Sequence, residues 1–187
     1  GADGYLWVGA QDGIARTAID PTTSLPGLWT EYPAEDEPYL PSGETVGFGF
    51  EGETLWIAIR GEQGGIARFG PNGFNEVVYS QNNAIIPSNQ ITDLSVTDQR
   101  VVVSTESGVA ILKPVITNPG DLLTLFARQG IAPEAGTGHV ITVADNGNRL
   151  WMLTKPTVNT PYGAFSTLDV DDEANPLRTP NSERFYG

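Results

Sequence analysis

The chain contains a single histidine, His139, which is the residue type best suited to acid–base chemistry near neutral pH. Such a side chain could serve as a general base or help to bind a metal ion. No second His and no obvious Ser or Cys partner accompanies it. A loop histidine that is solvated or bonded to backbone is therefore the simpler interpretation, and His139 is the only catalytic candidate.

An acidic segment offers a different chemistry, because Asp169, Asp171, Glu173 and Asn175 place oxygen atoms at alternating positions. Ca²⁺ prefers several carboxylate and carbonyl ligands of this kind. The segment lacks the central Gly and the final Glu of an EF-hand loop, so a solvated acidic turn is the competing interpretation. The same two interpretations apply to residues 35–37. Ca²⁺ is the one cofactor that the sequence suggests, and otherwise we expect none.

Other polar side chains fall in predicted loops and could hold a glycan or a peptide. Ordinary turn chemistry explains the Asn residues at least as well. The predicted ligand-binding residues are Arg60, Glu62, Gln63, Asn89, Gln90, His139, Lys155, Asn159 and Tyr162, with Asn82 and Asn83 beside them.

Composition limits the function further. Ten Lys and Arg against 23 Asp and Glu give the 187-residue chain a net charge of −13, so its surface repels phosphate and no nucleic-acid binding is expected. No apolar run approaches the roughly 18 residues of a membrane helix, so we expect no membrane insertion. The absence of Cys excludes disulfides and thiolate metal sites.

The elements that must position these residues are revealed by an internal repeat. Four similar apolar runs start at residues 6, 55, 101 and 150, which are 49, 46 and 49 residues apart. These runs are Leu6–Gly9, Leu55–Ala58, Val101–Ser104 and Leu150–Leu153. A period in the forties that carries strands is typical of β-propeller blades.

Each repeat contains the signals for four strands. A strand precedes each apolar run, as at Ile91–Val96. A Gly-containing turn, such as Gly64–Gly65, and a third strand follow the run. An aromatic strand comes last, as from Phe74 to Tyr79 and at residues 184–186. The predicted blades cover residues 1–45, which lack a first strand, 46–90, 91–139 and 140–187. Both faces of such sheets are apolar, so neighbouring blades must cover them. We therefore expect Trp7, Trp56 and Trp151 to pack between blades and Trp29 to lie on an outer strand.

Residues 55–112 carry a family resemblance. Leu55–Ala58, Gly65–Phe69, Tyr79, Ile86–Ile91 and Val101–Val109 together resemble the two-component-regulator propeller repeat. This resemblance implies an all-β propeller of about four four-stranded blades, belonging to a larger ring of six to eight. It also implies an extracytoplasmic location, either periplasmic or secreted to the cell surface, often as the sensor part of a bacterial signalling protein.

Two departures from a regular ring bear on function. One first strand is missing, so we expect further blades or a protein partner to complete the ring. Two turns between the second and third strands are longer, through Gly61–Gln63 and Lys155–Thr160. These turns emerge on the same face as the connections between blades, and binding residues usually lie on such loops.

Three functions remain open. The favoured one is a non-enzymatic ligand- or protein-binding module of a sensor or surface protein. The second is a lyase or hydrolase similar to streptogramin lyase, using His139 with a metal ion. The third is a structural subunit that completes a ring or lattice with another chain.

Overall fold

The computed structural model describes residues 4–75, 78–82, 86–98, 100–112, 139–146 and 149–155, and the backbone of 122–125 and 164–169. These residues form β-strands and contain no helix, so none of them forms a helix that could cross a membrane. All strand pairs within the sheets are antiparallel. The chain is all-β, as its sequence predicts.

The strands group into four sheets, each made from one repeat. The first sheet contains β1 (Tyr5–Ala10), β2 (Gly13–Ile19) and β3 (Pro26–Pro33). The second contains β4 (Glu44–Glu51), β5 (Thr54–Arg60), β6 (Gly65–Gly70) and β7 (Gly73–Phe74). The third contains β8 (Ile91–Val96), β9 (Val101–Thr105), β10 (Gly108–Leu112) and β11 (Leu122–Leu125). The fourth contains β12 (Val140–Asp145), β13 (Arg149–Thr154) and β14 (Ala164–Asp169).

These sheets follow the predicted repeat closely, with two points to note. The aromatic strand expected from Phe74 to Tyr79 is short: β7 covers two residues, and Tyr79 pairs with Ile66 in a separate bridge. The last expected strand, at residues 184–186, lies outside the described residues. Within the described part of the chain, no strand of the first sheet precedes β1, as expected from the sequence, so β1 is an edge strand there.

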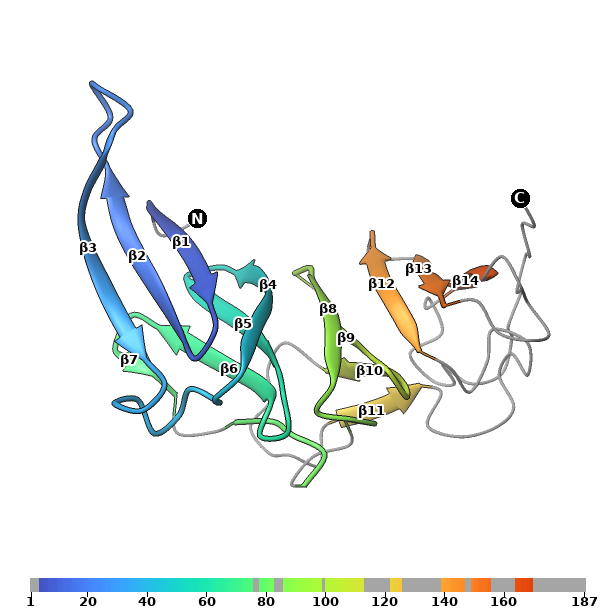
Figure 1. Ribbon diagram of the computed structural model, residues 1–187. Coiled ribbons are helices and arrows are strands. Elements are labelled where there is room, and N and C mark those ends of the chain that lie inside the picture. Colours follow the sequence, from blue (N-terminus) through green and yellow to red (C-terminus); the bar gives the residue numbers. More distant parts are fainter. Residues whose placement is uncertain are drawn as a thin grey trace.

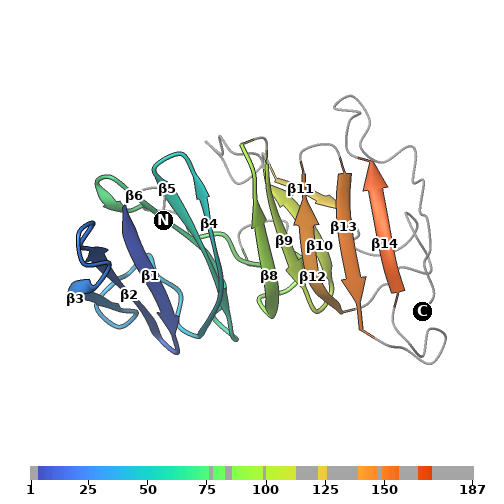
Figure 2. The same cartoon turned by 90° about the horizontal axis from the view of Figure 1, so that it is seen from above.

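The four sheets stand side by side along an arc (Figure 1), and the view from above shows them in chain order (Figure 2). The first strands of the second, third and fourth sheets, β4, β8 and β12, are neighbours in space. This is the arrangement of successive propeller blades, whose first strands lie innermost.

Three apolar clusters fill the spaces between neighbouring sheets. Trp7 and Ile57 belong to the cluster between the first and second sheets, and Trp56 and Val103 to the one between the second and third. The third cluster joins Val102 and its neighbours to the fourth sheet. The buried positions of Trp7 and Trp56 agree with their expected packing role, whereas Trp29, on β3, is 44% exposed.

Glycines let the inner strands approach closely. A Cβ atom added to Gly49 of β4 would lie 2.2 Å from Val96 Cγ2 of β8, which is too close for any side chain. Likewise, a Cβ atom on Gly9 of β1 would lie 2.3 Å from Thr45 Cγ2 of β4. The small residues in these strands therefore set the spacing of the first three sheets.

Polar groups instead join the inner strands of the third and fourth sheets. The Asp93 carboxylate of β8 accepts hydrogen bonds from the Thr142 hydroxyl and, at 3.1 Å, from the Val143 N–H, both on β12. The Thr92 hydroxyl donates to the Val140 carbonyl at 2.5 Å. Hydrogen bonds are directional, so these contacts fix how β8 and β12 are aligned.

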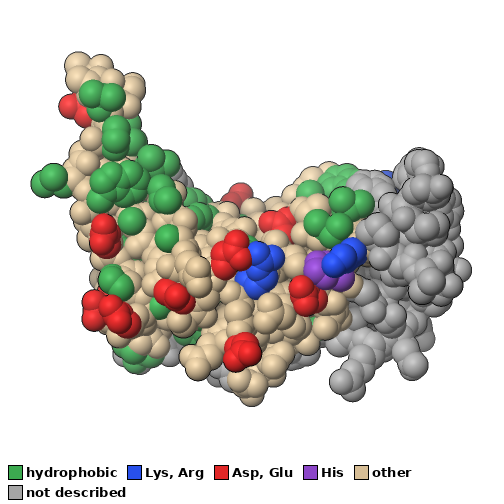
Figure 3. All heavy atoms as spheres, viewed as in Figure 1, with side chains coloured by type: hydrophobic (Ala, Val, Ile, Leu, Met, Phe, Trp, Pro, Cys, Tyr) green, Lys and Arg blue, Asp and Glu red, His purple; other side chains and the backbone are tan. Residues whose placement is uncertain are grey.

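The outer face of the first sheet carries exposed apolar side chains. Leu6 and Val8 of β1 are 43% and 45% exposed, and they alternate with the buried Trp7. Trp29 of β3 lies on the same face, because it pairs with Thr17, which pairs with Leu6, and it is exposed as well. Hydrophobic side chains gather at this end of the molecule in the space-filling view (Figure 3).

Candidate functional site on the loop face

Those predicted ligand-binding residues that the structure describes lie at one end of the sheets, which we call the loop face. It is formed by the turns after β5 and β9, by Lys155 after β13 and by the residues just before β8 and β12. Backbone hydrogen bonds tie these segments together. The Glu106 N–H donates to the Gln90 carbonyl at 3.0 Å, and the Lys155 N–H donates to the His139 carbonyl at 2.9 Å. The Gly61 N–H reaches the Asn89 carbonyl at 3.4 Å, which links the second sheet to the third. Backbone hydrogen bonds at the ends of the strands therefore fix the segments of the loop face relative to one another.

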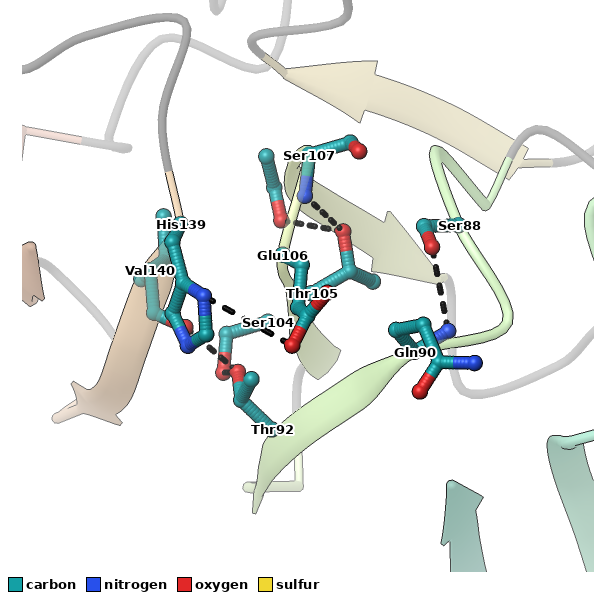
Figure 4. Close-up of polar contacts among 10 residues, drawn as sticks. Ser88, Gln90, Thr92, Ser104, Thr105, Glu106, Ser107, His139 and Val140 are labelled. Atoms are coloured by element: carbon teal, nitrogen blue, oxygen red, sulfur yellow. Dashed lines mark hydrogen bonds and ion pairs between the residues drawn. The ribbon is translucent and has the colours of Figure 1, made fainter. Parts of the chain in front are cut away.

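His139 faces a carboxylate on the neighbouring sheet. Its Nδ1 lies 3.7 Å from Glu106 Oε1, and the two side chains are 28% and 45% exposed. Figure 4 shows His139 at the start of β12 pointing toward the turn that carries Glu106. This pair offers a polar ligand both kinds of hydrogen-bonding group, because an imidazole N–H can donate and a carboxylate can accept.

Hydrogen bonds fix the backbone segments that carry His139 and Glu106. The hydroxyls of Thr92 and Ser104 lie 2.9 Å apart, and Thr92 also holds the backbone next to His139 through Val140. The turn that carries Glu106 is fixed by the Thr105 hydroxyl, which donates to the Gly108 carbonyl at 2.9 Å and accepts from the Ser107 N–H at 3.1 Å (Figure 4). The backbone on both sides of the pair is therefore preorganised.

An ion pair lies on the second sheet. Arg60, at the end of β5, forms an ion pair with Glu44, the first residue of β4, and both side chains are solvent-accessible. Glu62 and Gln63, in the turn that follows, are exposed. Acidic and basic side chains are intermingled on the face shown in Figure 3, so this surface presents both donors and acceptors to a ligand.

Asn89 has a different place from the one expected of a ligand-binding residue. Its side chain is only 3% exposed, and its amide is already bonded at both ends. The Nδ2 group donates to the Glu62 carbonyl at 2.9 Å, and Oδ1 accepts from the Gln81 N–H at 2.9 Å. Asn89 therefore holds the long turn that carries Glu62 and Gln63, while Gln90 beside it is half-buried.

Several sequence candidates fall outside the described residues. These are Asn83, Asn159, Tyr162, Asp171, Glu173 and Asn175. Asp169 ends β14, of which only the backbone is described. Within the part of the chain that the structure describes, no three His, Asp or Glu side chains come together as metal ligands. The Ca²⁺ hypothesis stays a prediction, and so does a metal ion at His139.

Sequence reasoning missed both carboxylate partners, Glu44 and Glu106. Strand register could have found Glu44, which pairs directly with Arg60 on the neighbouring strand. It could not have found Glu106, because Glu106 and His139 belong to different sheets. Opposite charges at directly paired positions of an antiparallel sheet attract each other.

Comparison with known proteins identifies the fold. No family model matches the chain, and no curated protein matches its sequence. Two structures of the extracellular domain of BT4673 from B. thetaiotaomicron, one described as a hybrid two component system and the other as a one component system, superpose with a TM-score of 0.61. Each is 14% identical to the chain, and the matches cover 97% and 89% of it.

The chain spans only a fifth of those two neighbours, 20% and 19% of their lengths. At this level of identity the likeness concerns the fold alone. The four sheets, their order and the neighbouring inner strands agree with that likeness. The chain is an all-β propeller segment.

Proposed function

We propose that this chain is a non-enzymatic binding module of an extracytoplasmic sensor or surface protein, and that its loop face receives a glycan or peptide ligand. The observation that carries the proposal is the His139–Glu106 pair, which is solvent-accessible and joins two sheets across 3.7 Å. A ligand that bonds to both side chains would contact two blades at once. The proposal also draws on the fold neighbours, which are described as extracellular domains of signalling systems.

The arrangement of polar side chains on the loop face fits ligand binding better than catalysis. His139 is paired with one carboxylate and is carried on a strand end, with backbone bonds on both sides. Arg60 and Glu44 extend the polar surface on the second sheet. Preorganised polar side chains of this kind lower the entropy lost when a ligand binds.

The test is a thermal-shift screen with neutral and acidic oligosaccharides and with short peptides. A ligand of the loop face should raise the Tm of the wild type but not that of a His139→Ala, Glu106→Gln double variant. Asp36→Asn, which removes an exposed carboxylate from the loop after β3, is the matched control and should keep the response. Equal responses in all three proteins, or none in the wild type, would contradict the proposal.

We also propose that the outer face of the first sheet packs against a further blade, which would extend the segment toward a ring of six to eight blades. The support is the edge position of β1 together with the exposed Leu6 and Val8 beside it. In the other sheets, the corresponding side chains are covered by a neighbouring blade: Leu55 and Ile57 of β5 are 1% and 0% exposed.

Light scattering and dye binding test this second proposal. The isolated chain should self-associate or bind an apolar dye through this face, and a Leu6→Thr, Val8→Thr variant should do neither while keeping its strand content. Threonine suits an exposed strand position, so the variant should fold. A wild-type chain that is monomeric and binds no dye would contradict the proposal.

A further inference from the structure

The first two sheets contain the same trio of side chains. In the first trio (Trp7, Arg16, Tyr32), Trp7 pairs with Arg16 across β1 and β2, and its ring stacks on Tyr32 at a centroid distance of 6.1 Å. In the second trio (Trp56, Arg68, Tyr79), the corresponding stacking distance is 6.4 Å. Repetition of the trio indicates that it belongs to the packing of the blade.

The two trios differ in what covers them. Trp56 and Tyr79 are 0% and 2% exposed, inside the core between the second and third sheets. The first trio instead adjoins a cavity of ≈ 700 Å³ between β3 and the β6–β7 hairpin. Its lining includes Arg16 and Tyr32 of the trio, together with Tyr5, Glu37, Glu53 and Phe74. That volume lies in the range of small-molecule sites.

Arg16 is held among aromatic rings, and among the described residues its Nε atom has no hydrogen-bond partner. Its guanidinium carbon lies 4.5 Å from the Tyr5 ring centroid and 5.0 Å from that of Phe69. Its Nε atom is buried without a hydrogen-bond partner, and within the described residues no carboxylate forms an ion pair with Arg16. Rings cover the faces of a guanidinium and leave its N–H groups free to donate in its plane.

We propose that this cavity binds a small ring compound that carries a carboxylate. The ring packs against the aromatic wall of Tyr32 and Phe74, and the carboxylate accepts hydrogen bonds from Arg16, whose planar fork matches it. Glu37 and Glu53, on the same lining, accept bonds from hydroxyl groups at the other end of the ligand. An aromatic hydroxy acid and a uronic acid both meet this description.

Arg68 separates this proposal from a purely structural role of the trio. Its guanidinium carbon lies 4.7 Å from the Trp56 centroid, and its Nε is also buried without a partner among the described residues. Arg68 does not line the cavity. Substitution of either arginine should cost similar packing energy, but only Arg16 should affect binding.

The experiment is a calorimetric titration of the wild type with two acids and their own amides: 4-hydroxyphenylacetate against 4-hydroxyphenylacetamide, and glucuronate against glucuronamide. We expect the acid of at least one pair to bind about tenfold or more tightly than its amide, the effect of one charge-assisted hydrogen bond. Arg16→Gln should remove this preference and Arg68→Gln should keep it. The acid–amide pair that shows this preference tells whether the ligand is an aromatic hydroxy acid or a uronic acid.

A measurement on the wild type alone covers the case in which Arg16→Gln does not fold. The binding acid should shift the aromatic NMR signals of Phe69, Phe74 and Tyr32 and leave those of Trp56 and Tyr79 unchanged. Binding of neither acid, equal binding of acid and amide, or equal loss in both arginine variants would overturn the proposal. These outcomes are independent of the loop face, because no loop-face residue lines the cavity.

Discussion

The Arg100 guanidinium Nε lies 2.9 Å from Asp145 Oδ2, and this ion pair joins the third sheet to the fourth. Arg100 directly precedes β9, and Asp145 is the last residue of β12. The two side chains are 14% and 0% exposed. The Asp145 N–H also donates to the Ser95 hydroxyl at 3.2 Å, so the end of β12 is attached to β8 by its backbone as well.

Breaking this pair from one side should destabilise the protein strongly. Asp145→Asn leaves the Arg100 charge mostly buried without its counter-charge, which typically costs about 3–5 kcal/mol. The double variant Arg100→Met, Asp145→Leu should lose far less, because it removes both charges and keeps the volume. Urea unfolding of the three proteins measures the difference. A double variant as unstable as Asp145→Asn would contradict this expectation.

Gly49→Ala should push the second and third sheets apart. The added methyl group would lie 2.2 Å from Val96 Cγ2 and 2.6 Å from Val96 Cβ, and such overpacking costs about 1–3 kcal/mol. Gly27→Ala is the control, because there the nearest atom, the Ala18 carbonyl oxygen, lies at 3.5 Å. Thermal unfolding should show a lower Tm for Gly49→Ala only. Similar Tm values for both variants would mean that the inner strands can separate without cost.

The turn at Asp20 should be sensitive to acid. The Thr23 and Thr22 N–H groups donate to Asp20 Oδ1 at 3.0 Å and 2.7 Å and lower the pKa of the carboxyl group below its ordinary value. Because the folded-state pKa is the lower one, the carboxylate supports the turn above the unfolded-state pKa. This support is lost as the pH falls through the folded-state pKa.

NMR titration of the Thr22 and Thr23 amide signals checks this expectation. Their midpoint should lie below the ordinary aspartate pKa of about 3.9. Asp20→Asn should show no such titration in these two signals. A midpoint at or above the ordinary value in the wild type would show that the two backbone bonds do not form in solution.

Much of the fold could be predicted because the repeat is visible in the sequence. The apolar run at Leu55–Ala58 and the Gly-containing turn at Gly64–Gly65 mark β5 and β6 directly. The strand predicted at Ile91–Val96 coincides with β8. Local signals suffice here, since turn residues and apolar alternation are properties of a few neighbouring residues.

The candidate sites depend on contacts between repeats, which local signals do not report. Nothing in the sequence around Asn89 shows that its side chain is buried and bonded to the turn at Glu62. Similarly, Gly13–Arg16 and Gly65–Arg68 have the same sequence, Gly-Ile-Ala-Arg. Only the packing of the sheets shows that Arg16 adjoins a cavity and that Arg68 does not.

The contrast between the sheet interfaces also has an evolutionary consequence. The apolar packing around Trp56 and Val103 tolerates exchange of one hydrophobic residue for another of similar volume, so its positions can change independently. In the pair of Arg100 with Asp145, a change of one partner alone leaves a buried charge unpaired, and in the bond between Thr142 and the half-buried Asp93 it removes a hydrogen bond between two sheets. Among homologous chains, substitutions at the interface of the third and fourth repeats should therefore be correlated. Substitutions at the interface of the second and third repeats should be independent of one another.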